Sequence, residues 1–412
     1  MVVVCPNSFK NDWAIAPPEW GIPQLVGSLW PKDKPPTEDQ RLYVVNFEAA
    51  RLGAYPALLD LIKRKRVFLV VDESGAMANP GTDTAKACVD LAQRAAMARL
   101  LNGTPQSKNV EDYFMQLKAV DGLGPWKNRY AFRNMFCVMG GYMGKKVVGL
   151  QNEDEFARML EGCSFRALKK DWRDLPPKIH HPLSLDMTPT QRKHYRAMLE
   201  EFSTQHGDVA VTADLVLTQM DKLRQISSGL LIDGGKSTFI EQPQKNPKLA
   251  ATREIIDGGA NKTIIVHYYK ATGLMLREHL HRKGYAEPAY IAGGMAPEEL
   301  TEQKRRFNDD PDCREIVVQE SAGFRGHTLL GGTGQDRATR MVFFEQSFSF
   351  YERSQIEDRN HRGEMDQPCT YYDLIASPMD KLALDIVLRK KQAADSVDEY
   401  RKIIAAELRS KK

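Results

Sequence analysis

The sequence predicts an α/β protein in which two parallel sheets are joined by a mainly helical insert. Short runs rich in β-branched residues, at 2–4, 42–46 and 67–71, alternate with segments whose apolar residues recur at helical spacing. A similar alternation returns from residue 262 onward. Strands that alternate with helices form parallel sheets covered by helices on both faces. The helical pattern at about 188–228, between the two alternating regions, predicts the insert.

The first alternating region contains two predicted helices between and after its strands. Apolar positions at helical spacing predict these helices at 47–65 and 84–100. The segment Leu175-Pro-Pro-Lys178 then interrupts the chain, because proline cannot continue a helix. Thr188-Pro189 indicates a new helix start, since proline is favoured in the first turn of a helix.

The second alternating region predicts further strands, helices and a charged C-terminal end. In chain order these are a strand at 262–267, a helix at 271–283, a strand at 289–292, a helix at 297–308, strands at 315–319 and 340–344, and an amphipathic helix or helix pair at 378–408. No period of 20–50 residues repeats along the chain, which excludes a solenoid or a propeller.

Composition restricts the class of protein. At about 150 residues per domain, 412 residues indicate two or three domains. The apolar runs are far shorter than the ~20 residues of a membrane helix, and the N-terminus lacks the features of a signal peptide. Six widely spread cysteines without a C-x-x-C pair indicate reduced core thiols and argue against a zinc site. We therefore expect a protein without a membrane partner that is cytoplasmic or nucleoid-associated and not secreted. The net charge of 58 − 54 = +4 permits a polyanionic partner without requiring one.

Two carboxylates follow the strand predicted at 67–71. An apolar strand that ends in Asp72-Glu73 places both at the carboxyl edge of a parallel sheet, where open α/β sheets bind ligands. In nucleotide hydrolases the aspartate at such a position holds Mg²⁺, directly or through water, and the glutamate orients the attacking water. The alternative interpretation is a strand followed by a solvated acidic turn.

A basic pair lies late in the chain, in the segment Gln355-Ile-Glu-Asp-Arg-Asn-His-Arg362. The spacing of three predicts that Arg359 and Arg362 share one face of a helix. Guanidinium groups suit bidentate contact with phosphate and neutralise charge on a transferring phosphoryl group. The alternative is an exposed basic helix face paired with Glu357 and Asp358.

The order of these motifs resembles the Swi/Snf-like branch of superfamily two helicases over nearly the whole chain. In the first half, residues 2–8 with Trp13 resemble motif Ia, 46–51 motif Ib, 72–75 the Asp-Glu-x-His box, 79–86 the stretch after that box, and Asn102-Gly-Thr-Pro105 motif III. In the second half, residues 165–178 resemble the stretch that links the lobes, Gln191, Tyr195 and 223–226 the helical insert, 262–267 motif IV, 317–323 the approach to motif V, and 355–362 motif VI.

The resemblance implies two RecA-like lobes with parallel sheets and a helical insert between them. The corresponding domains are a first lobe at 1–175, a linker and helical insert at 176–250, a second lobe at 251–385 and a C-terminal helix at 386–412. ATP and Mg²⁺ are the implied cofactors, and DNA, double-stranded, is the implied partner. The implied activity is ATP-dependent movement along that duplex.

The resemblance also implies roles for individual residues. Asp72 organises Mg²⁺ through water, and Glu73 activates the attacking water. Arg359 and Arg362 stabilise the transition state, and Gln355 joins them in nucleotide binding. The residues implied to contact DNA phosphates are Ser8, Arg51, Lys86, Thr104 and Ser321.

The sequence departs most from the family's pattern at the phosphate loop. The family has a Gly-x-x-x-x-Gly-Lys-[Ser/Thr] loop before motif Ia, and that pattern does not occur in these 412 residues. The first lobe is therefore expected to be N-terminally truncated, with an unpaired sheet position and exposed apolar surface. The loop would come from missing N-terminal sequence or from a partner polypeptide, and the isolated chain would hydrolyse ATP weakly or not at all. The alternative is a non-catalytic duplex-DNA binding subunit that retains the fold.

Smaller departures affect the surroundings of the acidic pair. Ser74-Gly75 replaces the Ala-His of the family's box, so that the histidine link toward motif III is lost. Trp13, Trp20 and Trp30 lie near prolines in a loop and are expected to be packing residues.

Overall fold

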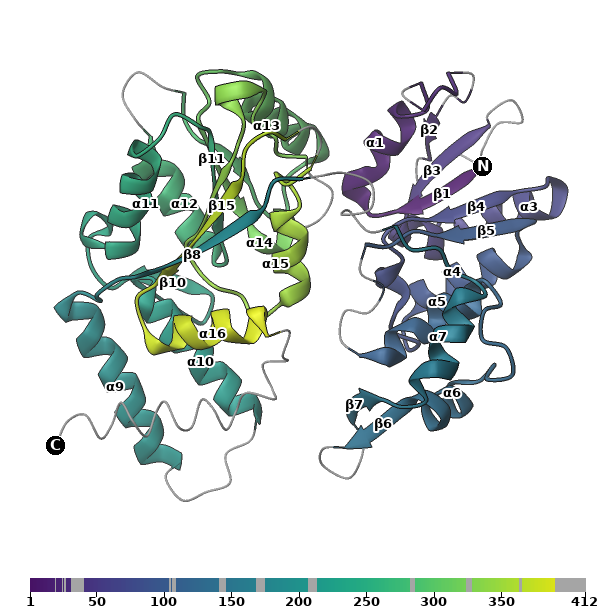
Figure 1. The fold of residues 1–412 in the computed structure, drawn as a ribbon, viewed down its shortest axis with the longest axis horizontal. Coiled ribbons are helices and arrows are strands. Elements are labelled where there is room, and N and C mark those ends of the chain that lie inside the picture. The colour runs from purple at the N-terminus through teal and green to yellow at the C-terminus, as the bar shows by residue number, and fades with distance from the viewer. Residues whose placement is uncertain are drawn as a thin grey trace. The chain divides into compact units, whose positions relative to one another are not determined.

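The computed structural model confirms the predicted class, an α/β fold with parallel sheets, in two compact units (Figure 1). The units are Met1–Leu168 and Lys169–Lys412. The structure describes residues 1–18, 20–23, 25, 27–30, 41–103, 105, 109–140, 146–167, 175–206, 213–281, 286–323, 328–362 and 365–389. Within these ranges no helix combines the length and the apolar character that crossing a bilayer requires.

The first unit begins with its most buried strand. Its elements are β1 (Val2–Cys5), η1 (Asn7–Phe9), α1 (Lys10–Ile15), β2 (Gly27–Leu29), β3 (Leu42–Asn46), α2 (Phe47–Arg51), α3 (Tyr55–Arg64), β4 (Phe68–Val71), η2 (Ser74–Met77), α4 (Asp83–Arg94), β5 (Met97–Leu100), η3 (Val110–Asp112), α5 (Tyr113–Ala119), α6 (Arg129–Phe136), β6 (Cys137–Gly140), β7 (Lys146–Leu150) and α7 (Glu153–Glu161). Strand β1 lies at the centre of the sheet, which explains why all four of its residues are apolar and buried.

The first sheet has the strand order β2-β3-β1-β4-β5, and all of its ladders are parallel. Because side chains alternate along a strand, Val2 and Val4 point to one face and Val3 to the other. The Val4 face packs against helices α2 to α5, and we call it the first face. The Val3 face packs against α1, and we call it the second face. Both sides of the central strands are therefore covered.

The prediction of a helix at 84–100 is wrong for the second half of that range. Helix α4 ends at Arg94, and Met97–Leu100 form β5, which pairs with β4. The Ala- and Leu-rich sequence favours a helix locally, but hydrogen bonding to the edge of β4 decides the conformation. The helix predicted at 47–65 likewise divides, because the chain breaks at 52–54 between α2 and α3.

The second unit contains a larger sheet. Its elements are β8 (Lys178–Ser184), α9 (Pro189–His206), α10 (Ala213–Ser227), β9 (Leu230–Asp233), β10 (Lys236–Phe239), η5 (Pro243–Lys245), α11 (Pro247–Asp257), β11 (Thr263–His267), α12 (Lys270–Leu280), β12 (Ala289–Ile291), α13 (Pro297–Asp309), β13 (Glu315–Gln319), α14 (Glu320–Gly323), η6 (Gly334–Asp336), β14 (Arg340–Phe343), α15 (Phe350–Glu357), β15 (Cys369–Ile375) and α16 (Pro378–Leu388). The strand order is β12-β13-β11-β14-β15-β8, again all parallel.

Helices cover both faces of the second sheet. Ile264 and Val266 pack with α13 and α15, whereas Ile265 packs with α11 and α12. Helices α9, α10 and α16 bury a separate apolar cluster that includes Tyr195 and Leu223. The helical insert predicted from about 188 therefore packs against the C-terminal helix of the described chain.

Two stretches of the second unit differ from the sequence interpretation. Residues 178–184, expected within a linker and insert, form β8 at the edge of the sheet, and 369–375 form the unpredicted strand β15. Of the helix or helix pair expected at 378–408, α16 accounts for Pro378–Leu388, and residues 390–412 lie outside the described residues. All six cysteines are free; five are buried as expected, but Cys163 is exposed.

Replacing Gly273 with alanine should destabilise the second unit. Gly273 lies inside α12, and a Cβ there would overlap the ring of His267, which is fully buried. Overpacking of this kind costs about 1–3 kcal/mol, more than the ~1 kcal/mol that alanine gains in a helix. Urea unfolding measures the change. Gly293→Ala is the control, because its Cβ would meet only Gln319, at an ordinary 3.6 Å. Equal stability of both variants would contradict the prediction.

Candidate functional site

Asp72 stands at the carboxyl end of β4 and is held from both sides. Its backbone N–H donates to the carbonyl of Val4 at 2.8 Å, which continues the ladder with β1. The Trp13 indole Nε1 donates to Oδ2 at 2.8 Å, and the backbone N–H of Glu73 donates to Oδ1 at 3.0 Å. Burial raises the pKa of Asp72, and these two hydrogen bonds oppose the rise. The carboxylate therefore has a fixed orientation, and each oxygen keeps a second lone pair.

Trp13 has a role that the sequence interpretation did not assign. It was expected to be a packing residue, and its ring does lie edge-on against Trp20 with centroids 5.2 Å apart. It also orients Asp72 from a helix, α1, that is 59 residues away in sequence. No local pattern in the sequence signals such a long-range donor.

Glu73 adopts a left-handed backbone conformation, with φ +50°. Residues other than glycine and asparagine rarely adopt it, since the Cβ crowds the backbone. Its half-buried side chain follows immediately after the oriented Asp72. Strained residues that persist are concentrated at functional sites.

Ser74 anchors this acidic turn to α5. Its buried Oγ donates to Oε1 of Gln116 at 2.8 Å, and Gln116 Nε2 donates to the carbonyls of Pro105 at 2.8 Å and Asp112 at 2.9 Å. Ser74 N–H also donates to the Leu101 carbonyl at 3.0 Å. The loss of the family's histidine was expected to remove the link toward 102–105. In this chain Ser74 and Gln116 form a different link to the same segment.

Two predicted contact residues of the first unit follow the carboxyl ends of its strands. Ser8 lies in η1 directly after β1 and is half-buried, and Arg51 ends α2 after β3 and is exposed. Asn46 Nδ2 donates to Asn7 Oδ1 at 3.1 Å. This hydrogen bond joins the carboxyl end of β3 to the segment that follows β1. These segments therefore share the edge of the sheet that carries Asp72.

Lys86 is less distinctive, and Thr104 lies outside the described residues. Lys86 is exposed in α4 and pairs with Asp83 at 3.3 Å. The basic run 63–66 is exposed at the end of α3 and the start of β4, away from the carboxyl edge.

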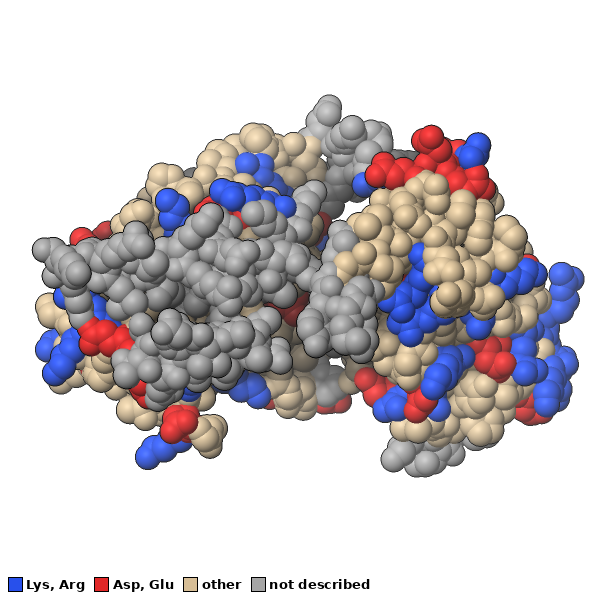
Figure 2. All heavy atoms as spheres, turned by 90° about the horizontal axis from the view of Figure 1, so that it is seen from below, with Lys and Arg blue, Asp and Glu red and all other residues tan. Residues whose placement is uncertain are grey.

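Figure 2 shows one face of the molecule, on which groups of Lys and Arg have Asp and Glu beside them. The mixed charge agrees with the small net charge of the chain.

In the second unit the structure brings Gln355 and Arg359 together. Arg359 is buried, and its Nε and Nη2 donate to the backbone carbonyl and side-chain Oε1 of Gln355 at 2.9 and 2.8 Å. Arg362 is half-buried, and its Nη1 donates to Thr328 Oγ1 at 3.0 Å.

The expectation that Arg359 and Arg362 share a helix face is wrong. Helix α15 ends at Glu357, and both arginines lie in the turn and irregular segment that follow. Asn360 holds this segment outside the helix, because its Nδ2 donates to the Ala338 carbonyl at 2.9 Å. The alternative of an exposed, ion-paired helix face is also wrong for Arg359, which is buried.

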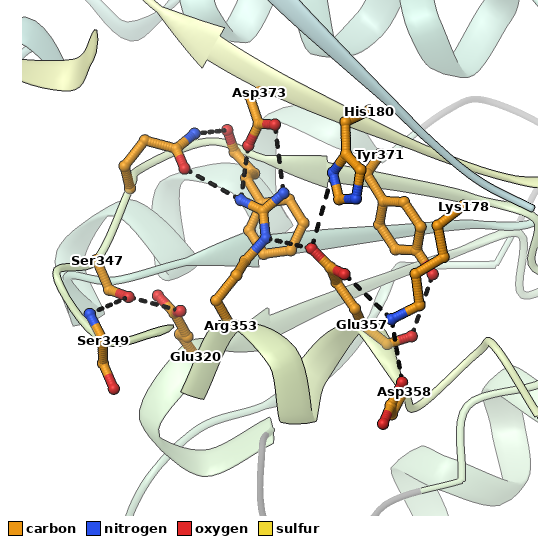
Figure 3. A network of polar contacts seen from close by, with 12 residues as sticks. Lys178, His180, Glu320, Ser347, Ser349, Arg353, Glu357, Asp358, Tyr371 and Asp373 are labelled. Atoms are coloured by element: carbon orange, nitrogen blue, oxygen red, sulfur yellow. Dashed lines mark hydrogen bonds and ion pairs between the residues drawn. The ribbon is translucent and has the colours of Figure 1, made fainter. Parts of the chain in front are cut away.

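A buried ion-pair network fixes α15 to the sheet (Figure 3). Arg353 pairs with Asp373 of β15 through both terminal nitrogens, at 2.6 and 3.3 Å, and its Nε pairs with Glu357 at 2.6 Å. Its Nη1 also donates to Gln346 Oε1 at 3.1 Å. The bidentate geometry sets the orientation of α15, and hence of Gln355, which lies between Arg353 and Glu357.

Lys178 extends the network to β8. Its Nζ lies 3.2 Å from Glu357 Oε2 and 3.0 Å from Asp358 Oδ1. Burial acts to raise the pKa of Glu357, but the charges of Arg353 and Lys178 outweigh it, so the pKa lies below its ordinary value. Glu357 is therefore charged at neutral pH and joins β8, α15 and β15.

Ser321 is exposed at the carboxyl end of β13, beside a buried carboxyl group. The side chain of the preceding residue, Glu320, accepts a hydrogen bond from Ser347 Oγ at 2.8 Å. Burial raises the pKa of Glu320 to about 7, and the bond from Ser347 opposes the rise. The contact holds the start of α14, on which Ser321 lies, and the sequence motif did not indicate it.

The residues around Asp72 fit a magnesium ion held mainly through water. Among the described residues no group of three or more His, Cys, Asp and Glu is placed to bind a metal. Mg²⁺ keeps several waters and usually takes only one or two carboxylates from a protein. Asp72, with one lone pair free on each oxygen, suits that mode.

In a comparison with protein families, residues 1–230 match the SNF2-related domain. Among curated proteins, the human DNA annealing helicase and endonuclease ZRANB3 is 24% identical over 98% of this chain and 36% of its own length. The mouse protein of the same name is also 24% identical, over 98% of this chain and 37% of its own length. The chain thus spans about a third of the length of these relatives.

Among solved structures, the Sulfolobus solfataricus SWI2/SNF2 ATPase core in complex with dsDNA is similar at 20% identity. The match covers 98% of this chain and 85% of that one, with a TM-score of 0.45.

Replacing Arg353 with methionine should strongly destabilise the second unit. Asp373 would stay buried without its partner and Glu357 would keep only Lys178, which together costs about 3–5 kcal/mol at neutral pH. The deficit should shrink below pH 4.5, the ordinary pKa of a glutamate, because only the wild type loses the stabilising charge of Glu357 as it is protonated. Urea unfolding at several pH values tests this. Arg305→Met, which removes an exposed pair with Glu302, should change nothing measurable.

Replacing Trp13 with phenylalanine should raise the pKa of Asp72 further. The variant keeps an aromatic ring and loses the donor that favours the charged carboxylate. Carbon-detected NMR titration of the Asp72 carboxyl group, assigned with Asp72→Asn, measures the change. Trp20→Phe is the matched control, since Trp20 contacts the ring of Trp13. An unchanged pKa in Trp13→Phe would contradict the role given to Trp13.

Proposed function

We propose that this chain, which belongs to the SNF2-related domain family, is the core of an ATP-driven translocase on duplex DNA. The observation that supports the proposal most is the acidic turn, where Asp72 is oriented by Trp13 and Glu73 is strained. Both stand at the carboxyl edge of a parallel sheet, where such folds bind ligands. Under this proposal the chain binds DNA as its partner and uses ATP and Mg²⁺ as cofactors.

Asp72 would hold Mg²⁺ through water, and Glu73 would accept a proton from the attacking water. Mg²⁺ at this position would neutralise charge on the phosphates. Gln355, Arg359 and Arg362 would contact the nucleotide from the second unit. The hydrogen bonds between Gln355 and Arg359 keep that guanidinium in a single orientation, which suits it to a defined phosphate oxygen.

The DNA contacts would be to phosphates. Ser8, Arg51, Lys86, Thr104 and Ser321 are the proposed residues. Hydroxyl and cationic side chains position a duplex without reading its sequence. Ser8, Arg51 and Ser321 follow strands at the carboxyl edges of their sheets.

The proposal includes a phosphate loop from outside these 412 residues. The loop pattern is absent from the sequence, and without it the backbone cradle and the lysine for the β- and γ-phosphates are missing. We therefore expect weak or no ATP hydrolysis by the isolated chain, measured by phosphate release with duplex DNA present. Robust DNA-stimulated hydrolysis would refute this part of the proposal.

The same absence supports a second candidate, a non-catalytic duplex-DNA binding subunit. Nucleotide-dependent affinity for a fluorescent duplex would favour the translocase. Steep salt dependence without a nucleotide effect would favour the binding subunit.

Variants separate nucleotide from DNA contacts. Arg359→Ala should remove the effect of nucleotide on duplex affinity and keep the salt slope. Arg51→Ala should reduce the salt slope by about one and weaken binding for every sequence. Glu73→Gln should keep nucleotide-dependent affinity and abolish any residual hydrolysis, since an amide cannot accept the proton. Loss of the nucleotide effect in Arg51→Ala but not in Arg359→Ala would contradict the assignment.

A further inference from the structure

The longest stretch of the chain without an acidic residue lies in the first unit and takes no part in the proposed function. Residues 122–152 contain five lysines and arginines and no aspartate or glutamate. At the chain's average of 54 acidic residues in 412, a stretch of that length would contain about four. The stretch includes helix α6 and the antiparallel hairpin of β6 and β7. Such a local excess of positive charge favours a polyanionic partner.

Helix α6 has one buried face and one exposed face. Phe132 and Phe136 are fully buried in the core of the first unit, with ring centroids 5.2 Å apart. The opposite face presents Tyr130, whose exposed fraction is 76%. Lys127 and Arg129, close to it in the chain, are also exposed. A large aromatic ring therefore lies in solvent between basic side chains, and the core does not account for it.

The β6–β7 hairpin continues this exposed surface beyond the end of α6 (Figure 1). A β-bulge between Val138 and Met139 shifts the register with β7 and changes the alternation of side chains there. Both side chains are exposed, at 38% and 37%. Arg133 of α6 donates through Nη2 to Met139 Sδ at 3.6 Å. The helix and the hairpin thus present basic and apolar side chains on one surface.

Hydrogen bonds hold the base of the hairpin to α6. The N–H of Gln151, directly after β7, donates to the Phe136 carbonyl at 2.9 Å. Gln151 Nε2 donates to the Asn134 carbonyl at 2.8 Å, and Asn152 Nδ2 donates to the Met135 carbonyl at 2.6 Å. These bonds satisfy carbonyls at the end of the helix, which have no partner within it. The relative orientation of α6 and the hairpin is therefore fixed.

Acidic groups border this surface and leave it positively charged. Glu111 pairs with Arg129 at 2.5 Å and lies 3.6 Å from Arg133 Nε. With Lys127, these arginines outnumber that single carboxylate. The acidic first turn of α7 begins at Glu153, beside the carboxyl end of α6, whereas Lys127 precedes the amino end.

We propose that this surface binds single-stranded DNA. The side chains that form it, which we call the α6–hairpin surface, are those of Lys127, Arg129, Tyr130, Arg133, Val138 and Met139. Its cations suit phosphates, and its exposed ring and apolar side chains suit the faces of unpaired bases. Contacts with the phosphates of a duplex would need the cations alone. A second copy of this chain would bring the same sign of charge, which disfavours it as the partner.

The α6–hairpin surface is joined to the carboxyl edge of the first sheet. Ser74 Oγ donates to Gln116, and Gln116 Nε2 donates to the Asp112 carbonyl. The residue before Asp112, Glu111, pairs with Arg129 of the surface. The duplex contacts of the proposed function lie at that same edge. A single strand bound to the α6–hairpin surface would lie beside the duplex, and its binding would need no nucleotide.

Fluorescence anisotropy of a labelled oligothymidylate of about 20 nucleotides, with the full chain and without nucleotide, tests this site. Tyr130→Ala should weaken binding by about tenfold and keep the salt slope, because one stacked base is lost. Tyr130→Phe keeps the ring and should bind like the wild type. Lys127→Ala should reduce the salt slope by about 0.7, the value for one phosphate contact of a single strand.

A duplex of the same length and the variant Lys63→Ala are the matched controls. Tyr130→Ala should not change duplex affinity, because the bases of a duplex are not free to stack on the ring. Lys63 is exposed at the end of α3, away from the carboxyl edge, and its removal should not change the single-strand salt slope.

Three results would overturn the inference. They are no binding of the single strand, an equal loss of single-strand and duplex affinity in Tyr130→Ala, and equally effective competition by polyglutamate, which has charge without bases. The last result would indicate an acidic protein partner instead. Single-strand binding with the expected responses, but no nucleotide effect on duplex affinity, would uphold the α6–hairpin surface and count against the proposed function.

Discussion

Parallel strand pairing is the constraint on which the rest of this structure depends. In each of the two large sheets every strand points the same way, so every connection leaves from the same edge. Asp72 after β4, Ser8 after β1 and Ser321 after β13 are at carboxyl edges for this reason alone. The backbone hydrogen bonds of these sheets are internal and buried. The polar side chains that follow the carboxyl ends of the strands can therefore contact a ligand.

Buried polar groups then orient the side chains that follow these strands. In the first unit a single indole N–H orients Asp72, and the contact of Ser74 with Gln116 ties the acidic turn to α5. In the second unit Arg353 has two carboxylates as partners, and Lys178 attaches the same helix to β8. Both arrangements join segments that are distant in sequence. Both place residues with proposed functions next to groups whose own role is structural, and low local dielectric makes the loss of any one partner costly.

The two units differ in how completely their sheets are covered. The second sheet has apolar clusters on both faces, and its edge strand β8 contains Pro182, a residue that discourages further pairing. Among the residues that the structure describes, the first sheet has neither protection at β5, where an apolar pair is exposed and an arginine bonds to its own strand. An unprotected parallel edge is unusual in an isolated protein, because parallel strands are normally buried.

The sequence by itself determined the fold class, most of the strands and the motif order that identifies the family. These depend on local periodicity, as in the four buried residues of β1, and on residue types at fixed spacing. It failed at β5, β8 and β15, because short or polar segments become strands only when a neighbouring strand supplies their hydrogen bonds. It also placed Arg359 and Arg362 on one helix. A hydrogen bond from Asn360 to the Ala338 carbonyl, which is distant in sequence, instead holds this segment outside the helix. Trp13, Gln116 and the bidentate partner of Arg353 were found only in the tertiary structure, since a hydrogen bond between distant segments leaves no periodic trace in the chain.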